Sequence, residues 1–375
     1  MQLDQYSGHA TLLEAITAQG EHMADTTADF FTPEEWEQCA RLGLTGLSVA
    51  EKYGGRGFGF TETSELIRAF GRQCPDMGLV FSVAAHLFAC AMPLYEHGSS
   101  ALREQILPGL ANGRLVGANA ITEDEAGSDV AALTTTAERV AGGYLLTGHK
   151  SFVSNAPAAD IFLVYASTDP DCRHLGISAF VVDRHSQGLT IGAPLSKAGL
   201  QRCPASWVRF DRCFVPSERL LGSPGQGMAI FQSSMRWERT CLFAAYLGQS
   251  ERLLHRCVDH ARRREQFGRP IGDNQAISHR LARMRLRTEA ARLLLQQACR
   301  ALDEGYRATS EIAMAKLAVS ENAVQTALEA LQLFGGSGIL AGTGIEQALR
   351  DALPCTTFSG TSEMQLEQIA VELGL

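Results

Sequence analysis

Apolar residues recur at helical spacing through residues 1–117, which we predict to form an N-terminal helical domain. Segments 61–73 and 100–110 each carry one apolar face. Segment 77–94 is apolar nearly all round, so we expect this helix to be buried. Residues 32–35, with the sequence TPEE, supply a hydroxyl cap, a proline and two acids, and therefore predict the start of a helix.

The pattern changes over residues 118–222 to short apolar runs separated by Asp- and Gly-rich turns, which indicates a middle β-domain. The predicted strands cover residues 144–148, 151–155, 161–165, 176–182 and 206–210. Helical periodicity returns over residues 223–375, and long helices are predicted at 227–263, 274–303 and 309–334. We therefore expect an α+β fold, with a β-barrel-like domain between a helical N-terminal domain and a C-terminal four-helix bundle.

The composition is that of an ordinary globular protein, with 375 residues of which 45% are hydrophobic and 20% are charged. The formal net charge of −8 argues against a nucleic-acid or anionic membrane partner. The N-terminal segment lacks the basic and apolar regions of a secretory signal. No apolar run approaches the roughly 20 residues of a membrane span, so we expect a cytoplasmic protein.

The cysteines and histidines do not predict a metal site. The ten cysteines are scattered without a C-x-x-C pair, so we expect neither a zinc site nor a disulfide framework, and most should be small core residues. His86 and His97 have no second histidine or carboxylate at helical ligand spacing. A histidine whose hydrogen bonds are satisfied is the favoured interpretation of both.

Two stretches of the middle domain are candidates for a functional site. Residues 121–129, ITEDEAGSD, are a loop by composition, and hydroxyl and backbone N–H groups on such a loop can hydrogen-bond a flat polar ring. Residues 148–155, GHKSFVSN, alternate as a strand that would present Phe152 and Ser154 to a planar cofactor. An ordinary surface turn and hairpin would have the same composition.

The order of these residues resembles the flavin-binding segment of the acyl-CoA dehydrogenase family. That family carries a T-E-P-x-A-G-S-D loop and then a G-x-K-x-[WYF]-[IV]-[ST]-N strand, and this chain has both, with Asp124 in place of the proline. Residues 197–222 also resemble the family, although Cys203 replaces a small hydroxyl residue. In its helix–β–helix order, the resemblance covers essentially the whole chain.

The resemblance implies that FAD binds between the β-domain and the C-terminal helices. Thr122, Ser128, Phe152 and Ser154 should meet the isoalloxazine ring or the acyl chain beside it. Phe152 would cover one edge of the ring, and Ser154 would offer a hydrogen-bond donor to flavin N5.

Segment 264–275 resembles the family's R-x-x-F-G-x-x-[IL]…Q segment, which crosses from a neighbouring subunit to the pyrophosphate and adenosine of FAD. The resemblance therefore implies a homotetramer, or at least a homodimer, in which Arg264 binds phosphate through its guanidinium group. A solvated helix end is the alternative interpretation of the basic run 262–264. The cofactor contacts implied in these C-terminal regions are Arg264, Gln266, Phe267, Gln275, Gln332, Gly335, Gly336, Thr361 and Glu363.

Dehydrogenation of an acyl thioester needs a base for the acidic α-proton, while the β-hydrogen leaves as hydride to flavin N5. Many members of the family supply the base as the glutamate of a Y-E-G-T loop, where this chain has Ser359. A minority, including the isovaleryl-CoA dehydrogenases, carries it on a helix in an L-x-x-E-R context, where Glu238 and Arg239 stand. We predict Glu238 as the base, with Ser128, Arg239 and Ser359 in the substrate site. Its apolar neighbours argue against the alternative of a helix-surface glutamate.

The serine in the loop and the W-E-R helix resemble the branch of the family that oxidises prolyl or hydroxyacyl groups tethered to a carrier protein in natural-product pathways. Cys241 and Ala244 favour a small or branched acyl group. The alternative of a catabolic short- or branched-chain acyl-CoA dehydrogenase is not excluded, because CoA and carrier proteins share a phosphopantetheine arm.

The reduced flavin is expected to be re-oxidised by an electron-transfer flavoprotein or by oxygen. The rival classes are a flavin monooxygenase on the same fold and a non-catalytic binder of FAD or thioester.

Overall fold

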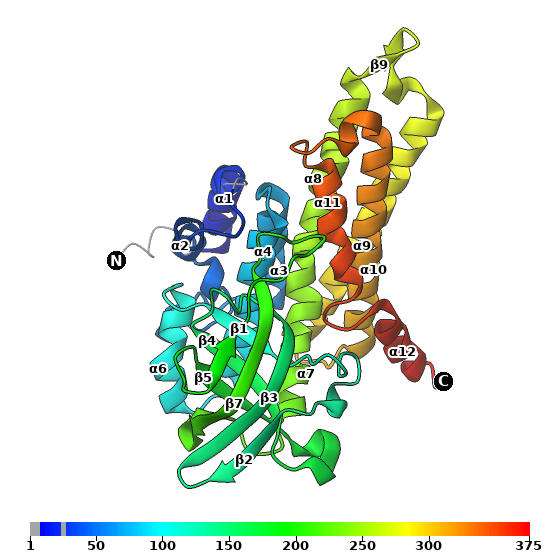
Figure 1. Cartoon of the computed structure of the whole chain (residues 1–375). Coiled ribbons are helices and arrows are strands. Elements are labelled where there is room, and N and C mark those ends of the chain that lie inside the picture. The colour runs from blue at the N-terminus through cyan, green and yellow to red at the C-terminus, as the bar shows by residue number, and fades with distance from the viewer. Residues whose placement is uncertain (1–7, 24–27) are drawn as a thin grey trace.

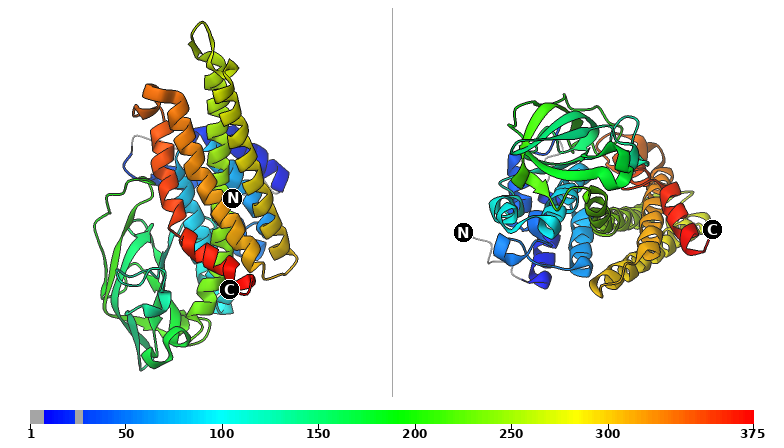
Figure 2. Two further views of the ribbon diagram at one scale, coloured as in Figure 1. Left: turned by 90° about the vertical axis from the view of Figure 1, so that its right-hand side faces the viewer. Right: turned by 90° about the horizontal axis from the view of Figure 1, so that it is seen from below.

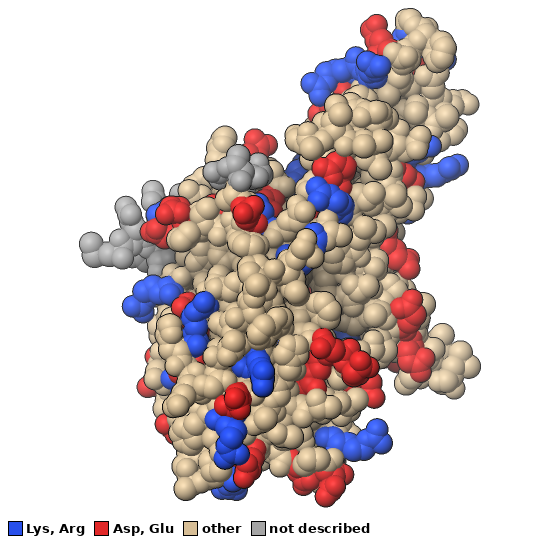
Figure 3. Space-filling model, in the orientation of Figure 1, with Lys and Arg blue, Asp and Glu red and all other residues tan. Residues whose placement is uncertain are grey.

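The structure is a computed structural model that describes residues 8–23 and 28–375. The first seven residues, on which the prediction of no secretory signal partly rests, lie outside this range. Helices form both ends of the chain, and a β-domain lies against one side of them (Figures 1 and 2). On the face shown in Figure 3, lysine and arginine side chains are interspersed with acidic ones.

The N-terminal region is helical, as its periodicity predicts. Its helices are α1 (His9–Gln19), α2 (Pro33–Arg41), α3 (Phe60–Gln73), α4 (Met77–Ala85), α5 (Met92–His97) and α6 (Ser100–Ala111). The predicted start of α2 is confirmed, because the Thr32 hydroxyl accepts a hydrogen bond from the Glu35 N–H and the Thr32 N–H donates to the Glu35 carboxylate. This reciprocal pair satisfies two backbone N–H groups that the first turn of a helix would leave free.

The apolar segment of this region forms one continuous helical rod, in which a π-helical stretch (His86–Ala91) joins α4 to α5. Its predicted burial is confirmed. The expectation that no apolar run is long enough for a membrane span is wrong, because the rod has 21 residues. Its most apolar window is 94% buried inside the protein, so the rod serves as a core helix of this region.

The middle domain contains an eight-stranded sheet in the order β6-β7-β3-β2-β4-β5-β8, with β1 paired to β4. Its strands are β1 (Gly117–Ala120), β2 (Thr136–Val140), β3 (Gly143–Ser154), β4 (Ile161–Ser167), β5 (Ile177–Asp183), β6 (Leu189–Ile191), β7 (Ala205–Pro216) and β8 (Leu220–Leu221). Every predicted strand lies within one of these, apart from single end residues. The predicted strands 144–148 and 151–155 are parts of one continuous strand, β3.

Strands β4 and β5 are buried on both faces, which explains their nearly unbroken apolar runs. Phe162, Val164 and Phe180 belong to the core inside the β-domain, whereas Leu163 and Tyr165 belong to the core shared with the helices. Successive side chains of a strand point to opposite faces, so one strand can serve two cores. The β-domain and the helices are therefore joined through a continuous apolar layer.

A buried guanidinium group also ties the β-domain to the N-terminal helices. Arg202 lies 2.6 Å from Glu35 Oε2 and 2.6 Å from Asp76 Oδ2, and it donates to two backbone carbonyls. These acceptors replace the water that the buried cation loses. The next residue is Cys203, whose Sγ lies 3.7 Å from Asn155 Oδ1, so a weak thiol contact stands where the family has a hydroxyl.

The C-terminal region is a helical bundle. Its helices are α7 (Gly227–Trp237), α8 (Phe243–Arg263), α9 (Gln275–Asp303), α10 (Thr309–Phe334), α11 (Ile345–Ala352) and α12 (Ser362–Glu372). A hairpin of β9 (Glu265–Gln266) and β10 (Arg269–Pro270) lies at the far tip of the bundle (Figure 1). The three long predicted helices are confirmed, but the first contains a π-helical turn (Glu238–Leu242) between α7 and α8.

Helix α3 of the N-terminal region crosses α8 of the bundle at very close range. A Cβ atom on Gly71 would lie 2.2 Å from the Ala245 carbonyl oxygen, and one on Gly248 would lie 2.0 Å from the Arg68 carbonyl oxygen. Only glycine permits this approach of two helix backbones. The predicted fold class, α+β with helical ends and a middle sheet, is confirmed.

Candidate active site

A cavity of about 430 Å³ opens where the β-domain meets α4 and α7. Its wall is built from the motif loop at residues 121–128, the end of β3, the π-helical turn that begins at Glu238, and the loop at residues 357–361. Apolar side chains form much of the remaining wall: Phe81, Ala85, Ala89, Phe231, Leu242 and Phe358. The cavity thus brings both motif stretches to the predicted base from distant positions in the sequence.

Glu238 is a buried carboxyl group with an exposed fraction of 8%. Its Oε2 accepts a hydrogen bond of 2.7 Å from the Ser359 hydroxyl, and its Oε1 is buried without a partner among the described residues. Burial raises the pKa of Glu238 to about 7, against the opposing effects of the Ser359 hydrogen bond and the charge of Arg239. A carboxylate with a pKa near neutrality can act as a general base at physiological pH.

Arg239 holds the loop that carries Ser359. Its Nε donates to the Ser359 backbone oxygen at 2.8 Å, and its Nη1 donates to Gln368 Oε1 at 3.1 Å. Ser359 has a φ of 52°, a conformation that non-glycine residues seldom adopt, and Gly360 follows with a φ of 89°. The left-handed turn directs the Ser359 hydroxyl toward Glu238, so loop and helix meet in one hydrogen bond.

Phe152 stands in the cavity wall with 68% of its surface exposed. A register shift in the β3–β7 ladder and a φ of 55° mark a bulge at this residue, and such bulges redirect side chains. Its ring has no aromatic partner among the described residues. The hydroxyls of Thr122, Ser128 and Ser154 line the same cavity and make no hydrogen bond with another described residue. A free aromatic face beside three free hydroxyls fits a flat ring with polar edges, such as a flavin.

The motif loop is anchored by a buried ion pair. Lys150 Nζ lies 2.7 Å from Glu123 Oε1 and also donates to a loop carbonyl at 3.0 Å. Glu123 accepts further hydrogen bonds from the N–H and hydroxyl groups of Thr134 and Thr135. Burial acts to raise the pKa of Glu123, but Lys150 and the hydroxyls outweigh it and lower this pKa to about 2. Lys150 and Glu123 therefore hold the motif loop, which forms part of the cavity wall, in place.

The structure brings most of the predicted cofactor and substrate residues to this one cavity. Those that line it together with Glu238 are Thr122, Ser128, Phe152, Ser154, Ser359 and Thr361. Arg239 lies behind the wall and supports it. Glu363 does not line the cavity and is exposed in the first turn of α12.

The other predicted cofactor residues lie at the far end of the bundle. They are Arg264, Gln266, Phe267 and Gln275, around the β9–β10 hairpin, and Gln332, Gly335 and Gly336, at the end of α10 (Figures 1 and 2). The two groups are neighbours, because His260 of α8 stacks on Phe334 of α10 with ring centroids 4.2 Å apart. Within one chain, this second group does not line the cavity around Glu238.

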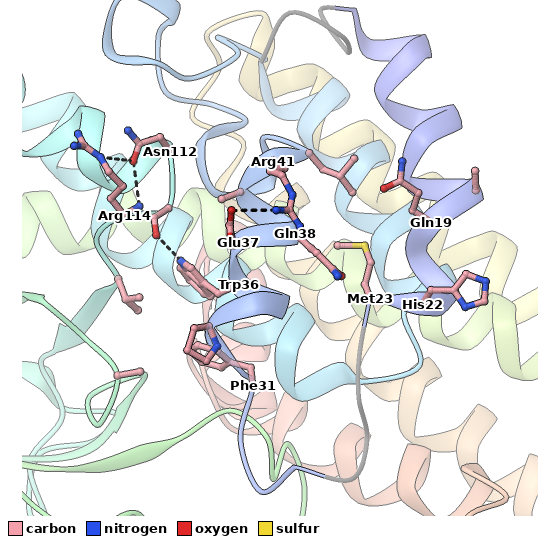
Figure 4. A pocket seen from close by; sticks show the side chains of 17 residues that line it. Gln19, His22, Met23, Phe31, Trp36, Glu37, Gln38, Arg41, Asn112 and Arg114 are labelled. Carbon is pink, nitrogen blue, oxygen red and sulfur yellow. Dashed lines mark hydrogen bonds and ion pairs between the residues drawn. The ribbon is translucent and has the colours of Figure 1, made fainter. Parts of the chain in front are cut away.

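A larger cavity, of about 1030 Å³, lies over α1, α2 and the end of α6. Figure 4 shows that polar groups in its wall pair with one another, since Arg41 hydrogen-bonds Glu37 and Arg114 hydrogen-bonds Asn112. Neither the motif residues nor Glu238 line this space. We therefore assign the chemistry to the smaller cavity, where an unpartnered carboxylate oxygen meets the motif residues.

The described residues contain no group of three or more His, Cys, Asp or Glu side chains placed to hold a metal. His86 is buried, with Nδ1 accepting from the Gly117 N–H at 2.8 Å and Nε2 donating to the Leu110 carbonyl at 3.2 Å. The expectation of satisfied hydrogen bonds is therefore confirmed for His86, but it is wrong for His97, whose Nε2 is buried without a hydrogen-bond partner among the described residues. The ten cysteines are free, and all but Cys172 are buried, as predicted for most of them.

Three residues of the cavity wall are not among the predicted site residues. Phe81 and Phe358 form a T-shaped pair with ring centroids 5.0 Å apart. Asn119 lies on β1, and its Oδ1 is buried without a partner among the described residues. Asn119 is the one polar side chain in the apolar run VGANAI, and this contrast is the signal that could identify it.

Three models of one family together match nearly the whole chain. "Acyl-CoA dehydrogenase, N-terminal domain" matches residues 10–114, the middle domain matches 118–213 and the C-terminal domain matches 225–374. An L-prolyl-[peptidyl-carrier protein] dehydrogenase of Pseudomonas fluorescens is 50% identical over 374 residues, which cover 99% of this chain and 98% of the relative.

Solved structures give the same result. "PigA with FAD and proline" matches with a TM-score of 0.95 and 40% identity, over 98% of this chain and 97% of that one. The "Prolyl Acyl Carrier Protein Oxidase AnaB" matches with a TM-score of 0.95 and 34% identity, over 98% of this chain and 99% of that one. The chain therefore belongs to the acyl-CoA dehydrogenase family and is an FAD-dependent oxidoreductase of that family.

Proposed function

We propose that this protein catalyses the α,β-dehydrogenation of a prolyl thioester tethered to a carrier protein, with Glu238 as the base. The observation that carries the proposal is the Glu238 carboxyl group. It is buried, it lines the cavity of the motif residues, and one of its oxygens has no partner among the described residues. Leaving such a group unpaired costs stability, which is expected where catalysis uses it.

Glu238 takes the α-proton of the acyl group, which the neighbouring thioester carbonyl makes acidic. Bound FAD supplies the acceptor for the two electrons and the β-hydrogen. The Ser359 hydroxyl fixes the orientation of the carboxylate, and Arg239 fixes the backbone of Ser359. The apolar wall excludes water, so the carboxylate is desolvated and its pKa lies near 7 instead of in the usual range of a glutamate.

A prolyl group on a carrier protein is supported by the relatives and by the size of the cavity. The Pseudomonas relative is an L-prolyl-[peptidyl-carrier protein] dehydrogenase, and so is a relative from Serratia that is 43% identical over 91% of this chain. Phe81, Phe231 and Phe358 narrow a cavity of about 430 Å³, which suits a five-membered ring better than a long acyl chain. The names of these relatives favour prolyl over the hydroxyacyl alternative, and the size of the cavity argues against a long acyl chain.

The cofactor would be held by two sets of residues. Thr122, Ser128, Phe152, Ser154 and Thr361 would contact the isoalloxazine ring from within the cavity. The Arg264–Gln275 segment would contact the phosphates or adenosine of a neighbouring subunit's FAD, in a homodimer or homotetramer. Support for this second role comes from Phe267, which is fully exposed, and from Gly335 and Gly336, where an added Cβ would meet no described atom within 4 Å.

The test is anaerobic bleaching of the oxidised flavin by matched substrates. The same prolyl group is offered as a CoA thioester and on a phosphopantetheinylated peptidyl carrier protein. Bleaching by the carrier-bound prolyl group, with weak or no bleaching by prolyl-CoA, supports the proposal. Equal bleaching by prolyl-CoA contradicts carrier specificity. Absence of bleaching by both, together with oxygen consumption by NAD(P)H-reduced flavin, indicates the monooxygenase.

A further inference from the structure

The side-chain amide of Asn119 has no hydrogen bond with any other described residue. It lies on β1, between Ala118 and Ala120, and its neighbours along the strand are apolar. Its Oδ1 is buried, and the residue lines the cavity that contains Glu238. The two ends of the amide exchange places by a half-turn about the last side-chain torsion, so either the oxygen or the nitrogen can face the cavity.

Two residues of the cavity wall therefore each carry a buried oxygen that lacks a partner among the described residues, Asn119 Oδ1 and Glu238 Oε1. Much of the surrounding wall is apolar, with Phe81, Ala85 and Leu242 among its residues. Most buried polar groups in proteins are hydrogen-bonded, so two unpaired acceptors in one cavity require an explanation. A purely hydrocarbon acyl group gives Glu238 its acidic α-carbon but offers the Asn119 amide no hydrogen-bond partner.

We infer that Asn119 is the specificity-determining residue that binds the α-nitrogen of an α-aminoacyl thioester, the prolyl ring nitrogen in particular. This inference rests on the proposed function. In such a substrate, an N–H donor and the acidic C–H group sit on adjacent atoms, so one small group presents a partner for each of the two side chains. Glu238 takes the C–H proton, and Asn119 Oδ1 accepts the hydrogen bond from nitrogen.

The chemistry of the ring nitrogen favours a neutral amide at this position. A protonated secondary amine draws electrons from the α-carbon and makes its proton easier to remove. A second carboxylate would also bind this ammonium group, but it would repel the charge of Glu238 in a buried site. An amide oxygen accepts the hydrogen bond without adding a charge.

The reaction balances without any bond change at nitrogen. The α-proton goes to the Glu238 carboxylate, and the electron pair of that bond forms the new Cα=Cβ double bond. The β-hydrogen leaves with its electron pair to the oxidised flavin of the proposed function. The substrate loses two electrons and the flavin gains them, while Asn119 exchanges no proton.

The test compares two acyl groups of nearly equal shape on the same phosphopantetheinylated peptidyl carrier protein. One is prolyl, and the other is cyclopentanecarbonyl, which has CH₂ in place of the ring nitrogen. Anaerobic flavin bleaching gives kcat/KM for each, and the prolyl/cyclopentanecarbonyl ratio is measured in wild type, Asn119→Leu and Asn119→Asp. Comparing ratios between variants cancels the different intrinsic acidity of the two α-protons.

The ratio should fall by about 10- to 150-fold in Asn119→Leu, the range for a lost hydrogen bond to a charged group. Asn119→Asp keeps an acceptor oxygen and should retain most of the preference for prolyl. The Asn119→Leu protein should bind FAD normally and unfold at the same temperature as wild type or higher, because the amide it lacks has no partner among the described residues.

Three outcomes would overturn the inference: an unchanged ratio in Asn119→Leu, equal loss of both substrates, or a loss of FAD affinity that accounts for the effect. The last would assign the amide to the cofactor. Failure of the proposed function looks different, because wild type would then not be bleached by any carrier-bound acyl group. Bleaching of wild type by prolyl with an unchanged ratio in Asn119→Leu contradicts the role of Asn119 alone.

Discussion

Ser359 donates a hydrogen bond of 2.7 Å to Glu238, so the loop position where many relatives carry a glutamate contacts the helix glutamate of this chain. The two positions are more than a hundred residues apart in sequence and share one cavity wall. The hydroxyl cannot replace a base, but it can orient one and stabilise its charged form. With the carboxylate on the helix at Glu238, Ser359 of the loop positions this carboxylate through its hydroxyl group.

The first prediction concerns Glu238 as the base. Glu238→Gln keeps the size of the side chain but removes the proton acceptor, so flavin reduction by carrier-bound prolyl should slow by at least about 100-fold. Bound FAD should be retained, and the unfolding temperature should be equal to that of wild type or higher. The measurement is stopped-flow bleaching under anaerobic conditions, with Glu104→Gln, exposed on α6, as the control. Wild-type bleaching rates in Glu238→Gln would exclude this residue as the base.

The second prediction is the pH dependence of the reaction. Burial raises the pKa of Glu238 to about 7, and only the ionised carboxylate can accept the α-proton. The rate of flavin reduction should therefore rise with pH and level off above about 7. The value of kcat/KM for flavin reduction, whose pH dependence reports the ionisation of the enzyme without substrate, is measured between pH 5.5 and pH 9. A rate that falls across this range would contradict a carboxylate base with a raised pKa.

The third prediction tests the hydroxyl of Ser359. Its hydrogen bond lowers the pKa of Glu238 and opposes the effect of burial. Removing a hydrogen bond to a charged group should raise the apparent pKa in the pH–rate profile by about 1 to 2 units. We expect this shift in both Ser359→Ala and Ser359→Gly, the second of which also suits the φ of 52°.

The control for Ser359 is Thr356→Ala in the same loop region. The Thr356 hydroxyl donates to the Leu353 carbonyl, and the residue is not part of the cavity wall. This variant should leave the pH–rate profile unchanged. If Thr356→Ala shifts the profile as much as the Ser359 variants do, the effect belongs to loop flexibility and not to the hydrogen bond.

The sequence is sufficient to predict most of the fold, because each region has one dominant periodicity. The α10 range follows from its apolar spacing, and the start of α2 follows from the cap chemistry at Thr32. The π-helical turn at Glu238 could not be predicted, because it has no composition of its own. The expectation that no apolar run is long enough for a membrane span fails because the helix continues beyond the predicted segment 77–94 and ends at His97.

Only those residues of the site that belong to a recognised motif can be predicted from the sequence. The resemblance identifies Phe152 and Ser154, but not the bulge that exposes the aromatic ring, since a bulge depends on the pairing with β7. Asn119 lies outside the recognised motifs. The role proposed for it rests on a buried side-chain oxygen that has no hydrogen-bond partner among the described residues. A sequence does not show which polar groups lack partners.

The fourth prediction concerns the exposed hairpin between α8 and α9. Phe267 is fully exposed in the single chain, so Phe267→Ala should change the unfolding free energy of the FAD-free protein by no more than about 0.5 kcal/mol. If the hairpin serves a neighbouring subunit's cofactor, the same variant should lose FAD during purification. The ratio of flavin to protein absorbance measures this loss, and a second variant, Arg264→Gln, should lose FAD as well. Full FAD occupancy in both variants would contradict the role of the hairpin.

The last prediction links catalysis to stability through Glu238. Its pKa in the folded protein is raised from 4.5 to about 7, so the folded state binds the proton more tightly than the unfolded state does. Its contribution to stability is therefore complete below about pH 4.5 and is lost as pH rises through about 7. Glu238→Gln cannot ionise, so its stability relative to wild type should increase by about 3 kcal/mol between pH 4.5 and pH 8. Denaturant unfolding of both proteins with saturating FAD measures the difference. An equal pH dependence in the two proteins would mean that the buried carboxyl keeps an ordinary pKa, and the explanation of its reactivity by burial would then be wrong.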